Sequence, residues 1–416
     1  MKFGVNATRF EEALFPALQV ATKNLPADCK SDNGIYHVIL RAEESHLIVT
    51  AGGHNTICHS VIPGEEGYQL VVPGTVCVDI VNLYKLVASY PPGSVIELAL
   101  KGRELYLKTI GNPSEIQILA TIDIDYEPVI YESPDTFKML FTVNNKIFLK
   151  GMNKVHYAIG LEDSRPDFNR QWCQVRNNQL RFVSGTGARF AVMDYMGHDI
   201  VTLAEETEVF FPSYSITNLL RCIKKAYCNE ITIRTMSGTS SNGQHLVACY
   251  DNTEIIIFQD GQFAIPPVEK ILDREYDYKF QCRLGDLKYA VAGVLATKTI
   301  QHEEVSPRHN TMLDVNLVRG VINILSFTNV TSKRCLPIVN VLVQGDKSKP
   351  MVRANSKYLV EVIQKGPKSE DTLITVSFNH QDENSDVPPI LVEYPAVMSQ
   401  RSEITEQFYM LFSVAL

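Results

Sequence analysis

Phe3-Gly4-Val5-Asn6 opens this 416-residue chain, and two near-copies of the phrase follow at almost equal spacing. They are Phe141-Thr142-Val143-Asn144 and Phe280-Gln281-Cys282-Arg283, which begin 138 and then 139 residues further along. Each phrase alternates about a phenylalanine, as a half-buried strand does, and helical periodicity follows it. A fixed long period indicates one structural unit used three times, and it favours a shape-building array over a catalytic pocket.

A second phrase repeats in the same frame: a turn, then an amphipathic helix, then alternating strands. In the first unit Val72-Pro73-Gly74 leads into a predicted helix at Thr75–Tyr90, and Pro212-Ser213 and Asn355-Ser356 precede its counterparts. We therefore predict an α+β fold of three repeated domains, each with two helices packed on antiparallel sheets. The predicted domains are 1–133, 134–270 and 271–416, and the predicted helices are 7–24, 75–90, 144–159, 213–228, 284–300 and 355–366.

Composition places the chain among ordinary globular proteins of two to four domains, with 45% hydrophobic and 21% charged residues. The sequence contains no apolar run of the ~18–20 residues that a membrane helix needs. Nine scattered cysteines indicate a reducing compartment rather than a disulfide framework. We expect a cytoplasmic protein without a membrane anchor. The net charge of −8 on its face argues against nucleic acid.

The charge is unevenly distributed between the predicted helices and the rest of the chain. The first helix pair carries Arg9, Lys23 and Lys85, but acids on the same helices cancel them. The middle pair carries six basic residues and no acid, and the six helices together sum to +8, which leaves −16 elsewhere. The basic residues of the middle pair are Lys146, Lys150, Lys154, Arg221, Lys224 and Lys225.

Lys146, Lys150 and Lys154 have the most informative spacing, because residues four apart share one face of a helix. Such a row gains no ion pairs along the helix, and neighbouring like charges cost ~0.2–0.5 kcal/mol per pair. A solvated face is one explanation and a surface that faces a polyanion is the other. The second basic helix favours the polyanion, and Lys and Arg contacts with phosphates are independent of sequence.

Motifs typical of enzymes are weak. His54, Cys58 and His59 are metal-ligand types, but no second cluster lies at zinc spacing, so packing is the favoured interpretation. Gly185-Thr186-Gly187-Ala188-Arg189-Phe190 lacks the lysine and hydroxyl residue of a phosphate loop, so it predicts a tight turn between two strands. We expect no catalytic residue, no metal and no cofactor.

Three stretches resemble the bacterial DNA polymerase III beta subunit, the sliding clamp. They are Met1-Lys2-Phe3-x-Val5, the stretch from Val72-Pro73 to Leu107, and Phe182–Val192, which is similar to the family's Ala-Thr-Asp-Gly-His-Arg-Leu-Ala run. The resemblance is good in the first two units and thin in the third. It implies three clamp-type domains in a head-to-tail dimeric ring, with helices lining the hole and sheets forming the rim.

The resemblance implies that the protein acts by encircling DNA and not by catalysing a reaction. A ring around duplex DNA would slide because no contact reads a base, and a tethered polymerase would rebind at high effective concentration. The implied partners are double-stranded DNA, a second copy of the chain, and a polymerase and clamp loader that carry short peptide motifs. The implied DNA-facing residues are Lys23, Lys85, Lys146, Lys150, Lys154, Arg221, Lys224, Lys225, Lys288, Lys298, Lys357 and Lys365.

The family also binds partner peptides between its second and third domains. Gly187, Arg189 and Phe190 match the family's glycine-x-arginine-leucine stretch, with Phe in place of Leu, and Phe168 falls where the family has a pocket leucine. The chain's ending falls on the family's Met-Pro-Met-Arg-Leu, without its Pro and Arg. The implied pocket residues there are Met410, Phe412, Val414 and Leu416, which could equally finish a terminal strand.

The third unit departs most from the family. His302–Asn310, Phe327–Met351 and Ser399–Glu406 are predicted to be inserted loops or extra strands. Two alternatives to a sliding clamp stay open. One is a scaffold of the same fold that binds proteins without encircling DNA, and the other is a metal-dependent or hydrolytic enzyme built on His54, Cys58 and His59.

Overall fold

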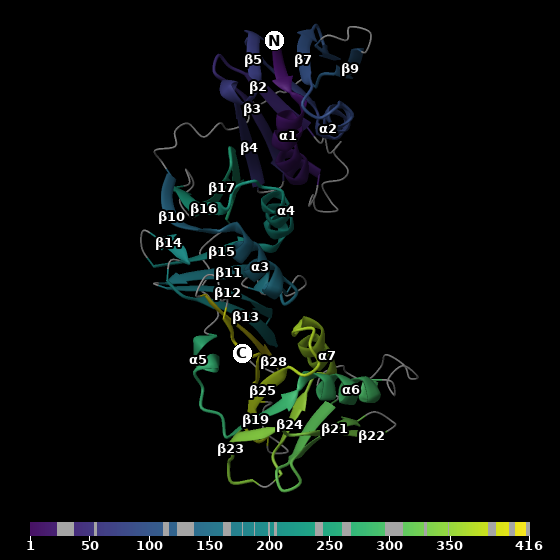
Figure 1. Cartoon of the computed structure of the whole chain (residues 1–416), viewed down its shortest axis with the longest axis vertical. Coiled ribbons are helices and arrows are strands. Elements are labelled where there is room, and N and C mark those ends of the chain that lie inside the picture. Colours follow the sequence, from purple (N-terminus) through teal and green to yellow (C-terminus); the bar gives the residue numbers. More distant parts are fainter. Residues whose placement is uncertain are drawn as a thin grey trace. The chain divides into compact units, whose positions relative to one another are not determined.

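The computed structural model describes residues 1–22, 37–53, 56–110, 116–122, 137–160, 168–176, 178–186, 188–198, 200–203, 206–237, 244–259, 268–295, 311–327, 331–347, 349–381, 388–398 and 404–412. Within them one order of elements occurs three times: a strand, a helix, five strands, a helix and three strands (Figure 1). The first set is β1(Lys2–Asn6), α1(Ala7–Thr22), β2(His37–Ala42), β3(His46–Gly53), β4(Thr56–Pro63), β5(Tyr68–Val72), β6(Gly74–Asp79), α2(Ile80–Ala88), β7(Val95–Lys101), β8(Glu104–Thr109) and β9(Ile116–Ala120).

The other two sets follow the same order. The second is β10(Phe137–Asn144), α3(Asn145–His156), β11(Arg170–Arg176), β12(Gln179–Thr186), β13(Arg189–Met196), β14(Val201–Leu203), β15(Thr207–Pro212), α4(Ser213–Lys224), β16(Glu230–Ser237), β17(Gln244–Tyr250) and β18(Thr253–Ile257). A short α5(Glu269–Leu272) precedes the third, which is β19(Tyr278–Arg283), α6(Leu284–Leu295), β20(Thr311–Asn316), β21(Val321–Phe327), β22(Thr331–Pro337), β23(Asn340–Val343), β24(Met351–Ala354), α7(Ser356–Lys365), β25(Leu373–Phe378), β26(Ile390–Glu393) and β28(Thr405–Phe412), with a two-residue β27(Val397–Met398) beside β28.

The repeated phenylalanine occupies the same place in each set. Phe3, Phe141 and Phe280 lie on β1, β10 and β19, and each side chain is at most 1% exposed. Their alternation is that of a strand with one face in the core. The predicted α+β class is confirmed, and so is the predicted turn between β12 and β13.

Two sequence predictions about elements are wrong. The helix predicted from Thr75 begins only at Ile80, because Thr75–Val78 continue β6, which pairs with β2. The β-branched residues there favour a strand, and the Asp79 carboxylate caps the helix by accepting from the Asn82 N–H at 2.7 Å. Phe327–Met351 is not an insertion, because it contains β22 and β23, the counterparts of β4 and β5.

The strands form four antiparallel sheets whose order shows how the repeats join. The five-stranded sheet runs β5-β1-β7-β8-β9 and the four-stranded sheet runs β22-β21-β20-β24. Between them in the chain's order lie a sheet of β14-β10-β16-β17-β18-β4-β3-β2-β6 and a sheet of β15-β11-β12-β13-β28-β26-β25-β19-β23. Each of these two long sheets is a five-strand half from one repeat joined edge to edge with a four-strand half from the repeat before it.

The chain divides into two compact units, each of which contains one such junction. The first comprises residues 1–149, 201–205 and 211–262, and the second comprises 150–200, 206–210 and 263–416. In the first, Phe3, Phe10, Leu14 and Leu83 belong to one buried cluster between the helices and sheets. In the second, α5 and α7 lie on opposite sides of the long sheet (Figure 1). The domain boundaries 1–133, 134–270 and 271–416 stay a prediction.

Candidate nucleic-acid interface and partner site

The basic row of the sequence lies on α3, and its members differ in exposure. Lys146 and Lys150 are exposed, whereas Lys154 is half-buried. Lys150 forms an ion pair with Glu406 on β28. Lys146, by contrast, is exposed at the start of the helix, so the row is not a uniform set of free ammonium groups.

Lys154 points toward β28 and α7. Its Nζ lies 4.3 Å from the centroid of the Phe408 ring and donates to the Lys365 carbonyl. Burial, followed by the nearby charges of Lys150 and Lys365, lowers the pKa of Lys154 to about 8, although Glu406 opposes the shift. The side chain therefore ties α3 to the third repeat, and it is less available to a phosphate than its position on the row suggests.

The second basic helix is more open. Arg221 and Lys224 are exposed in the last turn of α4, and Lys225 is exposed at its C-cap. Cations in this position also favour the helix, since its C-terminus carries partial negative charge. Lys225 Nζ lies 4.0 Å from the centroid of the Phe15 ring on α1. Lys85 on α2 is exposed as well.

In the third repeat the predicted DNA-facing lysines are partly engaged. Lys288 pairs with Glu370 at 2.6 Å, and Lys365 is half-buried with its Nζ 4.8 Å from the centroid of the Tyr157 ring. Lys357 is exposed at the start of α7. Lys23 and Lys298 lie outside the described residues.

The predicted partner-peptide residues are divided between two faces of the long sheet that contains β13 and β28. Phe168 and Phe190 lie together on one face, with ring centroids 6.1 Å apart. Both belong to a buried cluster on the face where α5 lies. Its members are Phe168, Trp172, Val183, Phe190, Val192, Phe210, Val268, Leu391 and Leu411, with Ile271, Leu272, Tyr276 and Tyr409 packed against it; we call it the α5-side cluster.

Arg189, Met410 and Phe412 lie on the other face, toward the helices. The Arg189 guanidinium pairs with Glu361 of α7, donates to the Tyr157 carbonyl at 3.2 Å, and lies 5.5 Å from the Tyr358 ring centroid. The Phe412 and Tyr358 ring centroids are 6.2 Å apart. The Tyr394 hydroxyl, which donates to the Val362 carbonyl at 2.6 Å, lies 3.4 Å from Met410 Sδ. Successive residues of a strand point to opposite faces, so the Arg189 and Phe190 side chains leave the sheet on opposite faces.

Sequence reasoning missed Leu411 and Tyr409, which pair with Phe190 and Val192 across the β13–β28 ladder. The available signal was the alternation of β28, in which odd and even positions point to opposite faces. Alternation alone could not show whether the odd or the even residues of β28 share a face with Phe190. That depends on the register between β13 and β28, which lie more than 200 residues apart in the sequence. Gly187, Val414 and Leu416 lie outside the described residues.

Of the residues of the alternative metal site, Cys58 and His59 do not converge. Cys58 and His59 are neighbours on β4, so their side chains point to opposite faces. Cys58 is fully buried, and the His59 imidazole shares a 2.9 Å hydrogen bond with Thr50. The described residues contain no group of three potential metal ligands, and His54 lies outside them. The pair as placed cannot chelate one ion.

Comparison by sequence finds no matching family model and no matching curated protein. Comparison by structure finds DNA polymerase III beta subunits over nearly the whole chain. That of Thermotoga maritima has a TM-score of 0.72 at 15% identity and covers 99% of this chain and 98% of its own. Those of Pseudomonas aeruginosa and Caulobacter crescentus have TM-scores of 0.71 at 17% and 18% identity, with 99% of both chains covered.

None of the described helices is long and apolar enough to cross a membrane. The similar structures include a Pseudomonas aeruginosa sliding clamp bound to griselimycin, with a TM-score of 0.68 and 17% identity. This chain therefore has the fold of the bacterial DNA polymerase III beta subunits, which are three-domain proteins, at 15–18% sequence identity to those compared.

Proposed function

We propose that this chain is a divergent beta subunit that acts as a DNA sliding clamp, without catalysis of its own. Two copies would join head to tail into a ring around duplex DNA. The ring would hold a polymerase and other DNA-processing proteins on the duplex. The predicted three domains are the repeats of such a protomer.

This proposal rests on two unpaired sheet edges, one in the five-stranded sheet and one in the four-stranded sheet. At the first junction β18 pairs with β4, and at the second β28 pairs with β13. β9 is the counterpart of β18 and β28 in the first repeat, and β22 is the counterpart of β4 and β13 in the third. Both are edge strands of their sheets within the described residues.

These two open edges are complementary, because both internal junctions pair the last strand of one repeat with the counterpart of β22 in the repeat before it. Pairing β9 of one copy with β22 of another repeats the same junction, and doing so twice closes two chains. β9 exposes Ile116 and Ile118, at 54% and 52%, and apolar side chains on an open edge strand invite pairing with another chain. On β22 Cys335 is exposed, so its thiol can be cross-linked to test the contact.

A cross-linking experiment tests the pairing. Single cysteines placed at 116, 118 and 120 on β9, treated with a short bismaleimide, should give a covalent dimer through native Cys335. Adding Cys335→Ser should abolish the dimer band. Failure of all three positions to cross-link while the protein elutes as a dimer would show that another surface joins the copies.

The DNA-facing surface that we propose centres on the exposed cations of α3, α4 and α7. Lys146, Arg221, Lys224 and Lys357 are exposed, and phosphate contacts by such side chains are weak individually and independent of sequence. Lys85 and Lys225 extend this set, with Lys23 and Lys298 kept as predictions. Lys154, Lys288 and Lys365 would contribute less, since each contacts groups of the chain itself.

For partner peptides we propose the α5-side cluster, around Phe168 and Phe190 with Tyr409 and Leu411. A similar clamp binds griselimycin, and a cluster rich in aromatic residues suits apolar anchors of a peptide. Phe190→Asp should abolish binding of a polymerase-derived peptide while Phe412→Leu, on the opposite face, should preserve it. Equal loss in both variants would contradict this assignment.

A clamp-fold scaffold that binds proteins without encircling DNA is the second candidate. The neutralised cations favour it: Lys288 is paired with Glu370 and Lys150 with Glu406. On α1, Arg9 is paired with Glu12. A scaffold would show the same retention on circular and linear DNA, whereas a clamp would not.

A further inference from the structure

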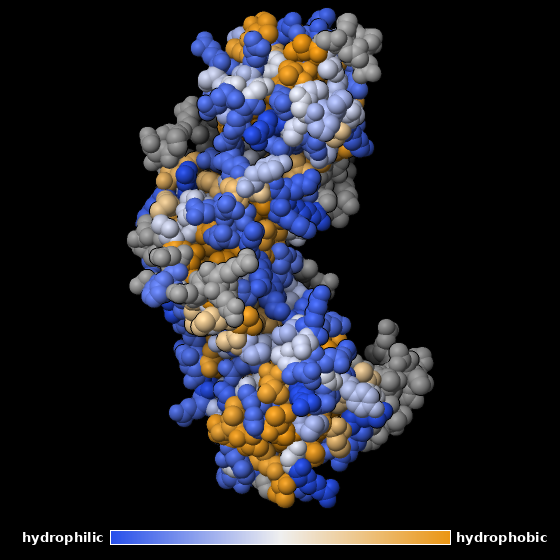
Figure 2. Space-filling view, in the orientation of Figure 1, coloured by the Kyte–Doolittle hydropathy of each residue, from blue (hydrophilic) through white to orange (hydrophobic). Residues whose placement is uncertain are grey.

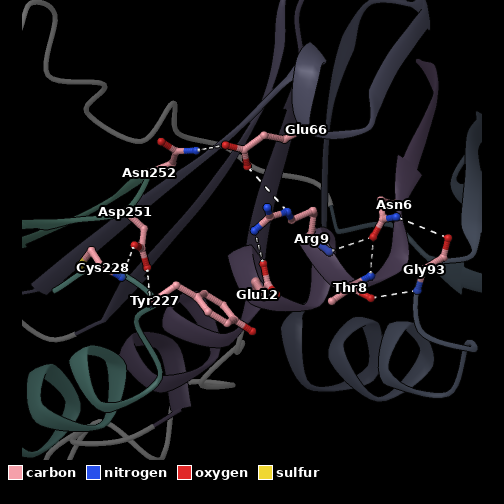
Figure 3. Close-up of polar contacts among 10 residues, drawn as sticks. All are labelled: Asn6, Thr8, Arg9, Glu12, Glu66, Gly93, Tyr227, Cys228, Asp251 and Asn252. Atoms are coloured by element: carbon pink, nitrogen blue, oxygen red, sulfur yellow. Dashed lines mark hydrogen bonds and ion pairs between the residues drawn. The ribbon is translucent and has the colours of Figure 1, made fainter.

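A pocket of about 350 Å³ opens in the first compact unit, beside the predicted DNA-facing cations but with the opposite charge. It lies between α1, the end of α4 and the turn that joins β17 to β18 (Figure 3). Its volume is at the lower end of pockets that bind small ligands. The proposed clamp function makes no use of this pocket.

The pocket carries an excess of carboxylates. Its lining includes Glu11, Glu12, Glu66 and Asp251 against the cations Arg9 and Lys225. Arg9 Nη1 lies 3.0 Å from Glu12 and its Nε lies 3.9 Å from Glu66, so this guanidinium is already neutralised (Figure 3). The acids that cancel the basic charge of the first helix in the sequence are thus gathered at one place, with net negative charge left over.

Aromatic rings form part of the lining. Phe15, Tyr84 and Tyr227 lie there, and Tyr227 is 72% exposed. Lys225 Nζ already sits 4.0 Å from the centroid of the Phe15 ring. Rings beside carboxylates attract cations, and a guanidinium stacks on such rings better than an ammonium does.

Tyr250 supplies an independent sign of a missing partner. It lines the pocket, its side chain is only 5% exposed, and its hydroxyl has no oxygen or nitrogen partner among the described residues. The Cys222 thiol beside it is a weak hydrogen-bond partner. Buried hydroxyls in folded proteins are normally satisfied, so this one is suited to accept from a ligand N–H.

We propose that this pocket binds an arginine side chain of a partner protein. The carboxylates would face the guanidinium, Tyr227 would stack on it, and the Tyr250 hydroxyl would accept one of its five N–H donors. An inserted arginine would anchor a partner at a site separate from the α5-side cluster. The inference does not depend on ring closure, since every group that it uses belongs to one compact unit of one chain.

Calorimetric titration of the full chain with N-acetyl-arginine amide tests the proposal, with the neutral isostere N-acetyl-citrulline amide as the matched probe. We expect a dissociation constant of about 1 mM for arginine amide, as befits one side chain, and at least tenfold weaker binding of citrulline amide. Equal binding of the two probes, or no binding of arginine amide at 10 mM or so, would overturn it.

Three variants locate the binding. Glu66→Gln should weaken arginine amide binding several-fold. Tyr250→Phe should weaken it without changing the folded structure, since the Tyr250 hydroxyl makes no bond to an oxygen or nitrogen in the part of the chain that the structure describes. Glu44→Gln changes an exposed acid elsewhere in the same unit and should have no effect. If Glu44→Gln weakens binding as much as Glu66→Gln does, the effect is general electrostatics and the pocket assignment fails.

Discussion

At the scale of single residues, an ion pair between β13 and α7 and the contacts of Lys154 on α3 connect the second and third repeats. Arg189 and Glu361 form an ion pair in which the side chains are 14% and 12% exposed. The other Glu361 oxygen, Oε2, has no hydrogen-bond partner among the described residues. Removing one member of a buried pair strands the other charge, at a cost of ~3–5 kcal/mol.

Arg189→Leu should therefore lower the free energy of unfolding of the second unit by ~3 kcal/mol or more. Arg189→Leu combined with Glu361→Leu should recover most of that loss, because no charge is left unpaired. Urea unfolding of the two variants and the wild type measures both effects. A double variant as unstable as the single one would mean that the ion pair itself, rather than the stranded carboxylate, carries the energy.

Lys154 predicts a pH dependence at the same interface. Its pKa is lowered to about 8, mainly by burial, whereas an unfolded lysine titrates near ~10.4. Between these values the unfolded chain binds more protons at this site than the folded chain does, so the Lys154 contribution to stability rises with pH. It is constant below about pH 7, where both states are protonated.

Lys154→Met removes this dependence. The free energy of unfolding of the variant, minus that of the wild type, should fall as the pH rises from 7 to 10. The difference cancels the tyrosines and thiols, which also titrate in that range. A difference that stays flat would show that Lys154 keeps its ordinary pKa in the folded protein.

At the scale of elements, the proposed pairing of two chains depends on the open edge of β9. Ile118→Lys places a charge at the proposed contact, and burying an unpaired charge costs ~3–5 kcal/mol. The dimer dissociation constant should rise by at least ~100-fold. Val71→Lys is the matched control, since it changes an equally exposed residue on β5, at the other edge of the same sheet. Sedimentation velocity distinguishes the two, and dimers of equal strength would rule out the β9 contact.

The elements also show how far sequence reasoning reaches. Alternation about Phe3, Phe141 and Phe280 correctly predicted the first strand of each repeat, because the pattern is local. The helix predicted from Thr75 was wrong because apolar residues at 76 and 78 suit a strand paired with β2 as well as they suit a helix face. The faces of Phe190 and Leu411 could not be predicted, since strand register is set by distant pairing.

Exposed apolar strands also occur elsewhere in the molecule. Figure 2 shows apolar side chains gathered around β23, where Val341, Leu342 and Val343 are 43–50% exposed. β23 is the counterpart of β5, which exposes Val71 and Val72 at 56% and 47%. Exposed apolar edge strands are therefore common to the repeat. Among the edge strands of the described residues, only β9 and β22 are counterparts of the strands that pair at the internal junctions.

At the scale of the whole molecule, charge and topology combine to predict how the proposed ring would hold DNA. Lys146→Glu with Lys224→Glu should weaken DNA binding and lower the steepness of its salt dependence by ~2 or more, because each lost phosphate contact removes ~0.9 from the slope. Lys138→Glu with Lys270→Glu changes two exposed lysines outside the basic helices and should leave the slope unchanged. Fluorescence anisotropy across a salt series measures it. Equal slopes for both double variants would place the DNA elsewhere.

Retention on circular and linear DNA tests the central proposal most directly. The protein, assembled on nicked circular duplex with a clamp loader, is passed through a gel-filtration column before and after one restriction cut. A ring that encircles DNA should stay with the circle and leave within minutes once the circle is cut, independently of sequence. Equal retention on the circle and on the cut duplex would contradict encirclement.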